Sequence, residues 1–318
     1  MSDPHESFRD QRMLGFPPRS HHILLPERPA NAARAALALY DATLHHQRLA
    51  ASVGDVLLRL RLGPFLRVGR LPDMLDLEWW SHWCHEVARD IAGDAHSIGF
   101  RIWEDRVAGL LLDRSSRPLA FVKVWHLPPR LSPWHPELDL QAEAIAALAQ
   151  PPPTTFRTPA VMHEGSFEGR EYVAFEPLPP GRHQPLRPDP DHLHRIVDEV
   201  QQRLADMYRP GDVPAHHVMS HGDLTPRNLR VASDGAVWLF DWEYTRWAPP
   251  LADELRFWVT DGALRPRSSP EREGRRIAAI LLQRGSRKDI TEAVCWSDYI
   301  TPPEAAIRAV VALEATRS

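Results

Sequence analysis

Three polar residues in the second half of the chain have the types and spacing of a magnesium site beside a general base. Asp223 precedes Asn228 by five positions, and Asp241 follows a β-rich stretch with a central turn. The segments 229–232 and 236–240, joined by a Ser-Asp-Gly turn, predict a β-hairpin. Its open end would bring Asn228 and Asp241 together, and their side-chain oxygens are hard ligands suited to Mg²⁺.

Two residues earlier in the chain could complete a charged site. Of the 38 basic residues only two are lysines, one of them Lys123, and Asn228 is one of only two asparagines. Lys123 lies in a β-rich run, 119–125, and Glu143 lies in a stretch with helical apolar spacing, 138–150. Alone, each would be an ordinary surface or edge-strand charge. Their order ahead of the expected magnesium site favours a shared function.

The motifs together resemble a known enzyme group. His221-Gly-Asp223-Leu-Thr-Pro-Arg-Asn228 matches the protein-kinase catalytic loop, H-R-D-L-x-x-x-N, except that glycine replaces the arginine. Leu239-Phe-Asp241-Trp-Glu243 and the hinge-like Tyr172-Val-Ala-Phe-Glu-Pro-Leu178 support the match. Over about residues 95–318 the chain is similar to the aminoglycoside phosphotransferase and choline kinase group of protein-kinase-like enzymes.

That resemblance implies an α+β, bilobal protein-kinase-like fold that uses ATP and Mg²⁺ to transfer the γ-phosphoryl group to a hydroxyl. It also implies a role for each candidate residue: Asp223 as the base, Asn228 and Asp241 as metal ligands, Lys123 on the nucleotide phosphates with Glu143 as its partner, the backbone of Glu176 and Leu178 on adenine, and Asp253 as a brace of the catalytic loop.

The sequence also departs from the protein-kinase pattern. No G-x-G-x-x-G loop is present, and the nearest candidate is 97–103. Gly222 stands where many protein kinases have the arginine that grips a phosphorylated activation loop. The interval from Asp241 to Asp253 is too short for such a loop. We therefore expect an enzyme that phosphorylation does not switch on.

The elements that must position these residues suggest three segments. Residues 1–94 predict an N-terminal helical extension, with a loose arm over 1–30 and helical spacing over 32–60 and 77–92. Residues 95–177 predict a small β-rich N-lobe. Residues 178–318 predict a mainly helical C-lobe, which follows the proline-rich connector 176–181 and starts with a helix capped by Asp189.

Composition restricts the function classes further. The 318 residues, with 43% apolar and 25% charged side chains, predict a folded chain of about two domains. A net charge of −4 gives no bulk attraction to nucleic acid or anionic membranes. No apolar run could span a membrane, the polar start is unlike a signal peptide, and two cysteines fit a reducing cytosol, so we expect a cytoplasmic protein. The paired histidines, among them His216 and His217, show no metal-ligand spacing.

The acceptor is less well defined by the sequence. The first hypothesis is a small-molecule hydroxyl kinase acting on an aminoglycoside, a sugar or a related metabolite. The second is a Ser/Thr peptide kinase of lanthipeptide-type biosynthesis, working before a separate lyase; the third, disfavoured because every expected site residue is present, is a non-catalytic pseudokinase. Residues 241–318 carry equal numbers of acidic and basic side chains, so they offer no acidic excess for a polycationic aminoglycoside.

Overall fold

The computed structural model describes residues 12–16, 22–37, 45–62, 71, 75–103, 106–125, 138–149, 151–179, 183–187, 189–265, 268–296 and 301–316. The chain divides into two compact units. Unit 1 comprises residues 1–136 and 159–182, and unit 2 comprises residues 137–158 and 183–318. The mixed α+β composition agrees with the fold class expected from the sequence.

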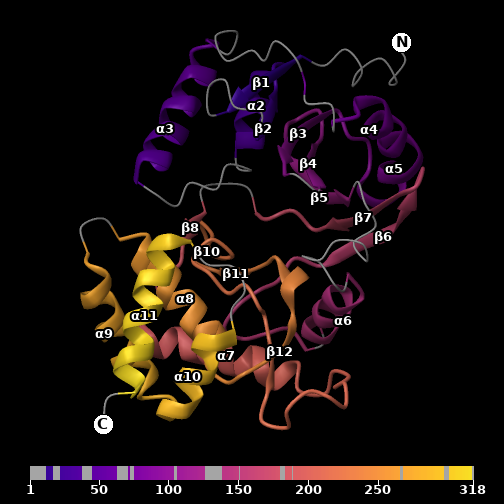
Figure 1. The fold of residues 1–318 in the computed structure, drawn as a ribbon. Helices are drawn as coiled ribbons and strands as arrows, with labels where there is room; N and C mark the ends of the chain where they lie inside the picture. Colours follow the sequence, from indigo (N-terminus) through magenta and orange to yellow (C-terminus); the bar gives the residue numbers. More distant parts are fainter. Residues whose placement is uncertain are drawn as a thin grey trace, which may run out of the picture. The chain divides into compact units, whose positions relative to one another are not determined.

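Unit 1 is built on one antiparallel sheet (Figure 1). Its seven strands are, in sheet order, β1 (Met13–Phe16), β2 (Ile23–Pro26), β3 (Ser97–Ile102), β4 (Arg106–Leu112), β5 (Pro118–Trp125), β7 (Arg170–Phe175) and β6 (Val161–Phe167). The strands expected over 107–112, 119–125 and 171–175 are confirmed by β4, β5 and β7.

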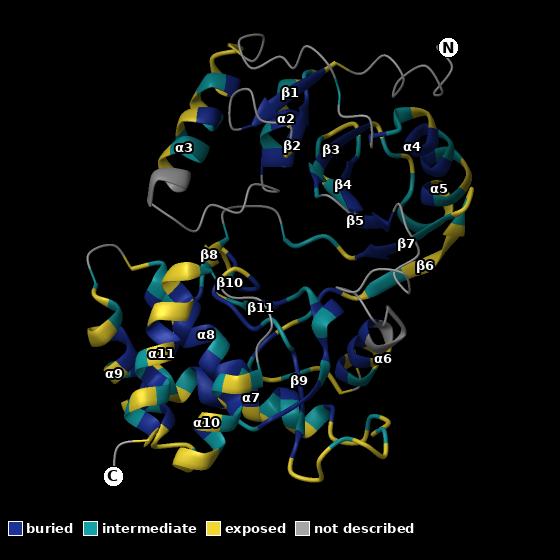
Figure 2. Ribbon diagram, in the orientation of Figure 1, coloured by how far each residue is buried: buried dark blue, intermediate teal, exposed yellow. Residues whose placement is uncertain are grey.

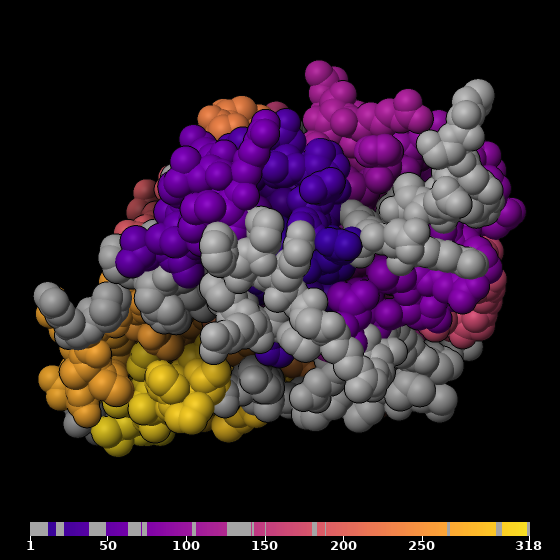
Figure 3. Space-filling view, turned by 90° about the horizontal axis from the view of Figure 1, so that it is seen from above, coloured from indigo at the N-terminus to yellow at the C-terminus, as the bar shows by residue number. Residues whose placement is uncertain are grey.

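The N-terminal segment is more ordered than its composition indicated. β1 pairs with β2, and β2 continues the sheet by pairing Ile23 with Arg101 and Leu24 with Phe100 of β3. The expectation of a loose arm over 1–30 is therefore wrong for these strands. Figure 3 shows the indigo N-terminal residues against the purple residues of the same unit. The apolar side chains of both strands are buried, which offsets the entropy of ordering them.

Helices cover this sheet as the apolar spacing indicated. The helix expected over 32–60 is divided into α2 (Ala30–Ala36) and α3 (His45–Arg59), and residues 38–44 between them lie outside the described part of the chain. The tryptophan-rich stretch forms α4 (Leu77–Trp83), a π-helical turn (Cys84–Ala88) and α5 (Arg89–Ala92). Its tryptophans pack into the apolar core of unit 1, dark blue in Figure 2.

Unit 2 is mainly helical (Figure 1). Its helices are α6 (Leu138–Ala149), α7 (Pro190–Arg203), α8 (Ala252–Ala263), α9 (Pro270–Leu281), α10 (Arg287–Trp296) and α11 (Pro302–Thr316). Asp189 caps α7 as expected, since its carboxylate accepts the His192 N–H at 2.7 Å. Two small sheets complete the unit: one has the strand order β11 (Val237–Leu239), β10 (Leu229–Val231) and β8 (Gln184–Pro185), and the other pairs β12 (Arg246–Ala248) with β9 (Val218–Ser220).

The division into units differs from the expected lobes at α6. We expected this helix within 95–177, but its residues belong to unit 2, where α6 packs on α7 and on the short 3₁₀ turn Trp242–Tyr244. Distant packing of this kind leaves no local mark in the sequence. Among the described residues, no helix combines the length and the apolar character needed to cross a membrane.

Candidate active site

The loop from His221 to Asn228 connects β9 to β10 and is held by a buried carboxylate. Asp253, in the first turn of α8, accepts the His221 N–H at 2.8 Å and the Gly222 N–H at 3.0 Å. Burial raises the pKa of Asp253 to about 6, and the two N–H donors oppose that rise. Asp253 therefore braces the catalytic loop, as the resemblance implied.

His221 connects this loop to the hairpin. Its Nδ1 accepts the Asp223 N–H at 3.2 Å, and its Nε2 lies 3.0 Å from the Phe240 carbonyl. The two contacts require a neutral imidazole that donates from Nε2. Because Phe240 immediately precedes Asp241, the imidazole links the expected base to the expected metal ligand.

The hairpin forms as predicted and brings two carboxylates and one carboxamide close together. β10 pairs with β11, and the Phe240 N–H donates to the Asn228 carbonyl at 3.2 Å. The Asn228 side-chain NH₂ donates to the Asp223 carboxylate at 2.9 Å and to its carbonyl at 3.0 Å. Asp241 is close enough for its charge to raise the pKa of Asp223. The structure thus brings Asp223, Asn228 and Asp241 together within unit 2.

Asp241 sits in a backbone conformation that few residues adopt. Its φ of 74° and ψ of 54° lie in the left-handed region, which costs a residue with a side chain about 1–2 kcal/mol. Aspartate tolerates this region better than most residues. The neighbouring Trp242 is buried, and its indole N–H donates to the Thr158 hydroxyl at 2.8 Å. That packing holds the turn in place behind the carboxylate.

Arg256 is a member of the site that the sequence did not reveal. It lies three residues after Asp253 on α8, on the same helix face, and its Nε and Nη2 each lie 3.1 Å from Asp223 Oδ1. Burial raises the pKa of Asp223 to about 6, and Arg256 acts in the opposite direction. With 36 arginines in the chain, composition gave no signal for this one.

Gly222 is required by the backbone. Its φ is 81°, and a Cβ at this position would lie 1.9 Å from the Tyr244 carbonyl oxygen. A side chain cannot be placed there without moving the loop. The departure from the kinase arginine therefore has a steric cause in this chain. The interval from Asp241 to Asp253 contains the 3₁₀ turn, β12 and the start of α8, joined by Thr245 and residues 249–251.

The other candidate residues are placed as follows. Lys123 is buried on β5, opposite Val173 of β7, with its Nζ 5.9 Å from the centre of the Phe175 ring. β7 ends at Phe175, so Glu176 and Leu178 follow directly in the same unit, and the Glu176 N–H donates to the Ala160 carbonyl at 2.8 Å. Glu143 is exposed on α6 of unit 2, so its pairing with Lys123 stays a prediction.

The nearest candidate for a phosphate loop takes a different form. Residues 97–102 form the continuous strand β3, in which Gly99 pairs with Leu110 of β4. Gly99 therefore serves a strand and not a loop. Trp103 follows, with the guanidinium groups of Arg101 and Arg106 4.6 and 5.0 Å from its ring centre.

A small pocket adjoins the catalytic loop within unit 2. Its walls come from β9, the loop, β12, α8, α10 and α11. The lining residues are Ser220, Gly222, Arg246, Ala252, Asp253, Leu255, Arg256, Val259, Ala293, Trp296 and Arg308. Three of them are arginines, and the single carboxylate, Asp253, is occupied by backbone N–H groups. The lining is therefore basic beside the expected base.

Comparison with known proteins gives a family match for the segment that contains the catalytic loop. The model of the phosphotransferase enzyme family, APH, matches residues 181–289, which include the catalytic loop and Asp241. Among curated proteins, no match was found.

Solved structures that match include a thermostable mutant of aminoglycoside phosphotransferase APH(4)-Ia with ADP and hygromycin B, at 12% identity and a TM-score of 0.41, covering 74% of this chain and 99% of that one. The aminoglycoside phosphotransferase APH(3'')-Id from Streptomyces rimosus matches at 15% identity and a TM-score of 0.37, covering 76% and 99%. The Rio2 kinase from Chaetomium thermophilum matches at 13% identity and a TM-score of 0.32, covering 91% of each chain.

The similarity of this segment to the phosphotransferase family is supported by the family match and by the geometry of the loop. Both fall on the same residues, and both agree with the resemblance drawn from the sequence. Residues 181–289 of this chain are similar to the phosphotransferase enzyme family, whose model they match.

Proposed function

We propose that the chain is an ATP- and Mg²⁺-dependent phosphotransferase that transfers the γ-phosphoryl group to a hydroxyl of a small molecule, with Asp223 as the general base. The observation that carries this proposal is the position of the Asp223 carboxylate between Arg256 at 3.1 Å and Asn228 at 2.9 Å. Both donors orient the carboxylate, and a pKa near 6 leaves it ionised at neutral pH.

The donor set at the end of the hairpin fits Mg²⁺. Asn228 Oδ1 and the Asp241 carboxylate are oxygen ligands, and such sites bind Mg²⁺ through one or two carboxylates together with substrate phosphates. Bound there, the ion would neutralise charge on the transferred phosphoryl group. Lys123 would contact the nucleotide phosphates with Glu143 as its partner. Adenine would contact the Glu176 carbonyl and the Leu178 N–H.

The basic pocket supports a narrower choice of acceptor. Arg246, Arg256 and Arg308 line it, and Arg256 also contacts the base. Arg256 is paired with Asp223 and Glu304, so Arg246 and Arg308 would supply the positive charge that repels a polycationic aminoglycoside. A neutral or anionic hydroxyl compound would not be repelled. We therefore propose a sugar or a related metabolite without multiple positive charges. A peptide acceptor and a non-catalytic role are outcomes of the test.

The acceptor is tested with γ-labelled ATP, Mg²⁺ and a panel of neutral sugars, anionic sugars, aminoglycosides and Ser/Thr-rich peptides. Label on a neutral or anionic sugar is the expected result. Label on aminoglycosides alone would contradict the charge argument, and label on peptides alone would establish the peptide kinase. A blank panel with intact nucleotide binding would favour the pseudokinase.

The metal role is tested separately with Asp241→Ala. The substitution removes a carboxylate ligand, so Mg²⁺-dependent nucleotide binding should be lost. Calorimetric titration of ATP with and without Mg²⁺ measures this. Unchanged metal dependence in the variant would contradict the assignment of Asp241.

A further inference from the structure

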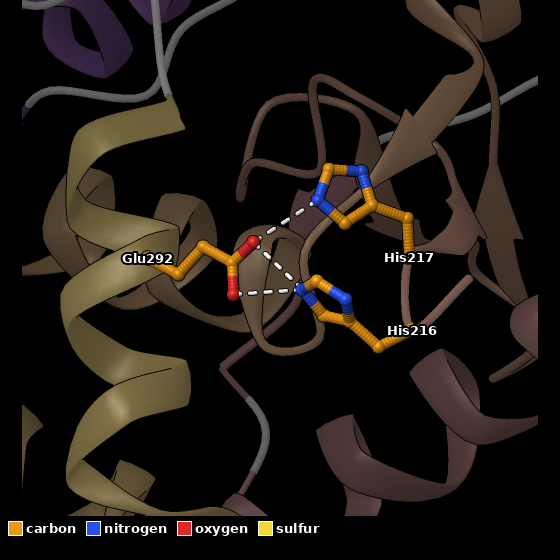
Figure 4. Close-up of side chains that lie close together, drawn as sticks. All are labelled: His216, His217 and Glu292. Atoms are coloured by element: carbon orange, nitrogen blue, oxygen red, sulfur yellow. Dashed lines mark hydrogen bonds and ion pairs between the residues drawn. The ribbon is translucent and has the colours of Figure 1, made fainter. Parts of the chain in front are cut away.

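Two adjacent histidines and a distant glutamate converge outside the catalytic loop. His216 and His217 directly precede β9, and Glu292 lies on α10. Figure 4 shows both imidazoles directed at the carboxylate. His216 Nε2 lies 2.7 and 2.9 Å from the two Glu292 oxygens, and His217 Nε2 lies 3.1 Å from Oε1. The helix supplies a third ligand 75 positions from His217, which explains why spacing in the sequence gave no sign of it.

Packing fixes one imidazole and leaves the other accessible. His217 is buried, and its ring lies edge-on to Trp296, with the ring centres 5.1 Å apart. Its carbonyl accepts a hydrogen bond from Arg209 at 2.7 Å, which holds the backbone. The His216 side chain is 50% exposed. The cluster thus has one rigid ligand and an open side through which an ion can enter.

The donor atoms are suited to a transition metal. One ligand atom from each of the three residues lies within 4.8 Å of the others. Two imidazole nitrogens and one carboxylate oxygen are a known protein ligand set for Zn²⁺, with water in the fourth position. Bonds of about 2.0–2.2 Å to one tetrahedral ion place its ligand atoms roughly 3.4 Å apart, so small side-chain rotations would admit it.

A simple ion pair explains only part of this arrangement. His216 Nε2 contacts both carboxylate oxygens, so an ion pair with Glu292 would need this imidazole alone. His217 nevertheless directs its own Nε2 at the same Oε1 atom, so both imidazoles converge on one carboxylate. A metal ion uses both imidazoles in their neutral form.

We propose that His216, His217 and Glu292 form a Zn²⁺ site distinct from the magnesium site of the catalytic loop. The ion would link α10 to the segment that leads through β9 into His221. It would also fix Trp296, which contacts His217 and lines the basic pocket. Its role is therefore to stabilise the pocket wall, independently of which acceptor the enzyme uses.

The test uses the untagged full-length protein, stripped with EDTA and then kept in millimolar Mg²⁺ so that the catalytic loop does not compete. Calorimetry with Zn²⁺ should give one site that His216→Gln and Glu292→Gln each weaken by roughly 100-fold or more. Thermal melting should show Tm rising by about 5 °C at Zn²⁺ one hundred times above Kd, and this rise should be absent in His216→Gln and Glu292→Gln.

The matched control is His82→Gln, which removes a histidine that pairs with Glu168 at 3.3 Å in unit 1. This variant should bind Zn²⁺ like the unmodified protein. Melting of each variant in EDTA shows that it is folded. Equal Zn²⁺ stoichiometry and affinity in the unmodified protein, His216→Gln and Glu292→Gln would overturn the site. A Tm that responds to pH but not to Zn²⁺ would assign the cluster to an ion pair and overturn it as well.

Discussion

The contact between Arg256 and Asp223 should determine the pH at which the enzyme works. Two opposite charges 3.1 Å apart attract by about 5 kcal/mol at an effective dielectric constant of ~20, before the desolvation of either group is counted. The side chains are only 17% and 26% exposed, so solvent screens the pair incompletely. A single opposite charge at this distance lowers a carboxyl pKa by about 1–3 units.

Arg256→Gln removes that charge and keeps much of the side-chain length. The pKa of Asp223, about 6 with the arginine present, should rise to roughly 7–9. A base whose pKa is raised is protonated over a wider range, so activity is lost as the pH falls through the new value. For a shift of about two units, kcat/KM at pH 7 should fall roughly tenfold and recover above pH 9.

The assay is the pH profile of kcat/KM between pH 5 and 10, measured with the acceptor found in the panel. Arg272→Gln is the matched control, since Arg272 is exposed on α9 and its N–H is held by Ser269. Its acid limb should stay near pH 6. An unmoved acid limb in Arg256→Gln would refute the claim that Arg256 sets the protonation of the base. A uniform loss at every pH would assign Arg256 to acceptor binding alone.

Two further predictions concern the scaffold. Gly222→Ala places a Cβ 1.9 Å from the Tyr244 carbonyl oxygen at a φ of 81°, so kcat should fall by roughly tenfold or more as the loop shifts. The control Gly235→Ala lies in the open hairpin turn and should leave kcat unchanged. Equal activity of the two variants would contradict the steric argument. Burial raises the pKa of Glu199, but hydrogen bonds from Thr155 and its neighbours lower it to about 2, so this carboxylate contributes about 3 kcal/mol to the free energy of unfolding above pH 4.5, and the contribution is lost as the pH falls towards 2. Urea unfolding at pH 7 should show that loss in Glu199→Gln. An unchanged unfolding midpoint in this variant would exclude the contribution.

Local signals in the sequence predicted much of unit 2. The hairpin behind Asn228 followed from its turn and its β-rich flanks, and the start of α7 followed from Asp189 and Pro190. The catalytic loop was recognisable because its residue types stand at fixed spacing. For the same reason Asp223, Asn228 and Asp241 could be placed together before any fold was known.

Contacts between distant segments could not be predicted in this way. The pairing of β2 with β3 joins residues about 75 positions apart, and the apolar runs that form β1 and β2 are only four residues long. Arg256 reaches Asp223 from another element, and Glu292 reaches the histidines from α10. Such partners are chosen by packing, and packing depends on the whole unit.

The Asp223→Asn variant tests most directly whether Asp223 is the base of a phosphoryl transfer. The amide keeps the shape of the carboxylate but cannot accept the proton from the acceptor hydroxyl. Transfer from labelled ATP, measured in a single turnover, should slow by about 10²–10⁴-fold, while the affinity for Mg²⁺ and nucleotide stays nearly unchanged. Undiminished transfer in this variant would show that Asp223 is not the base.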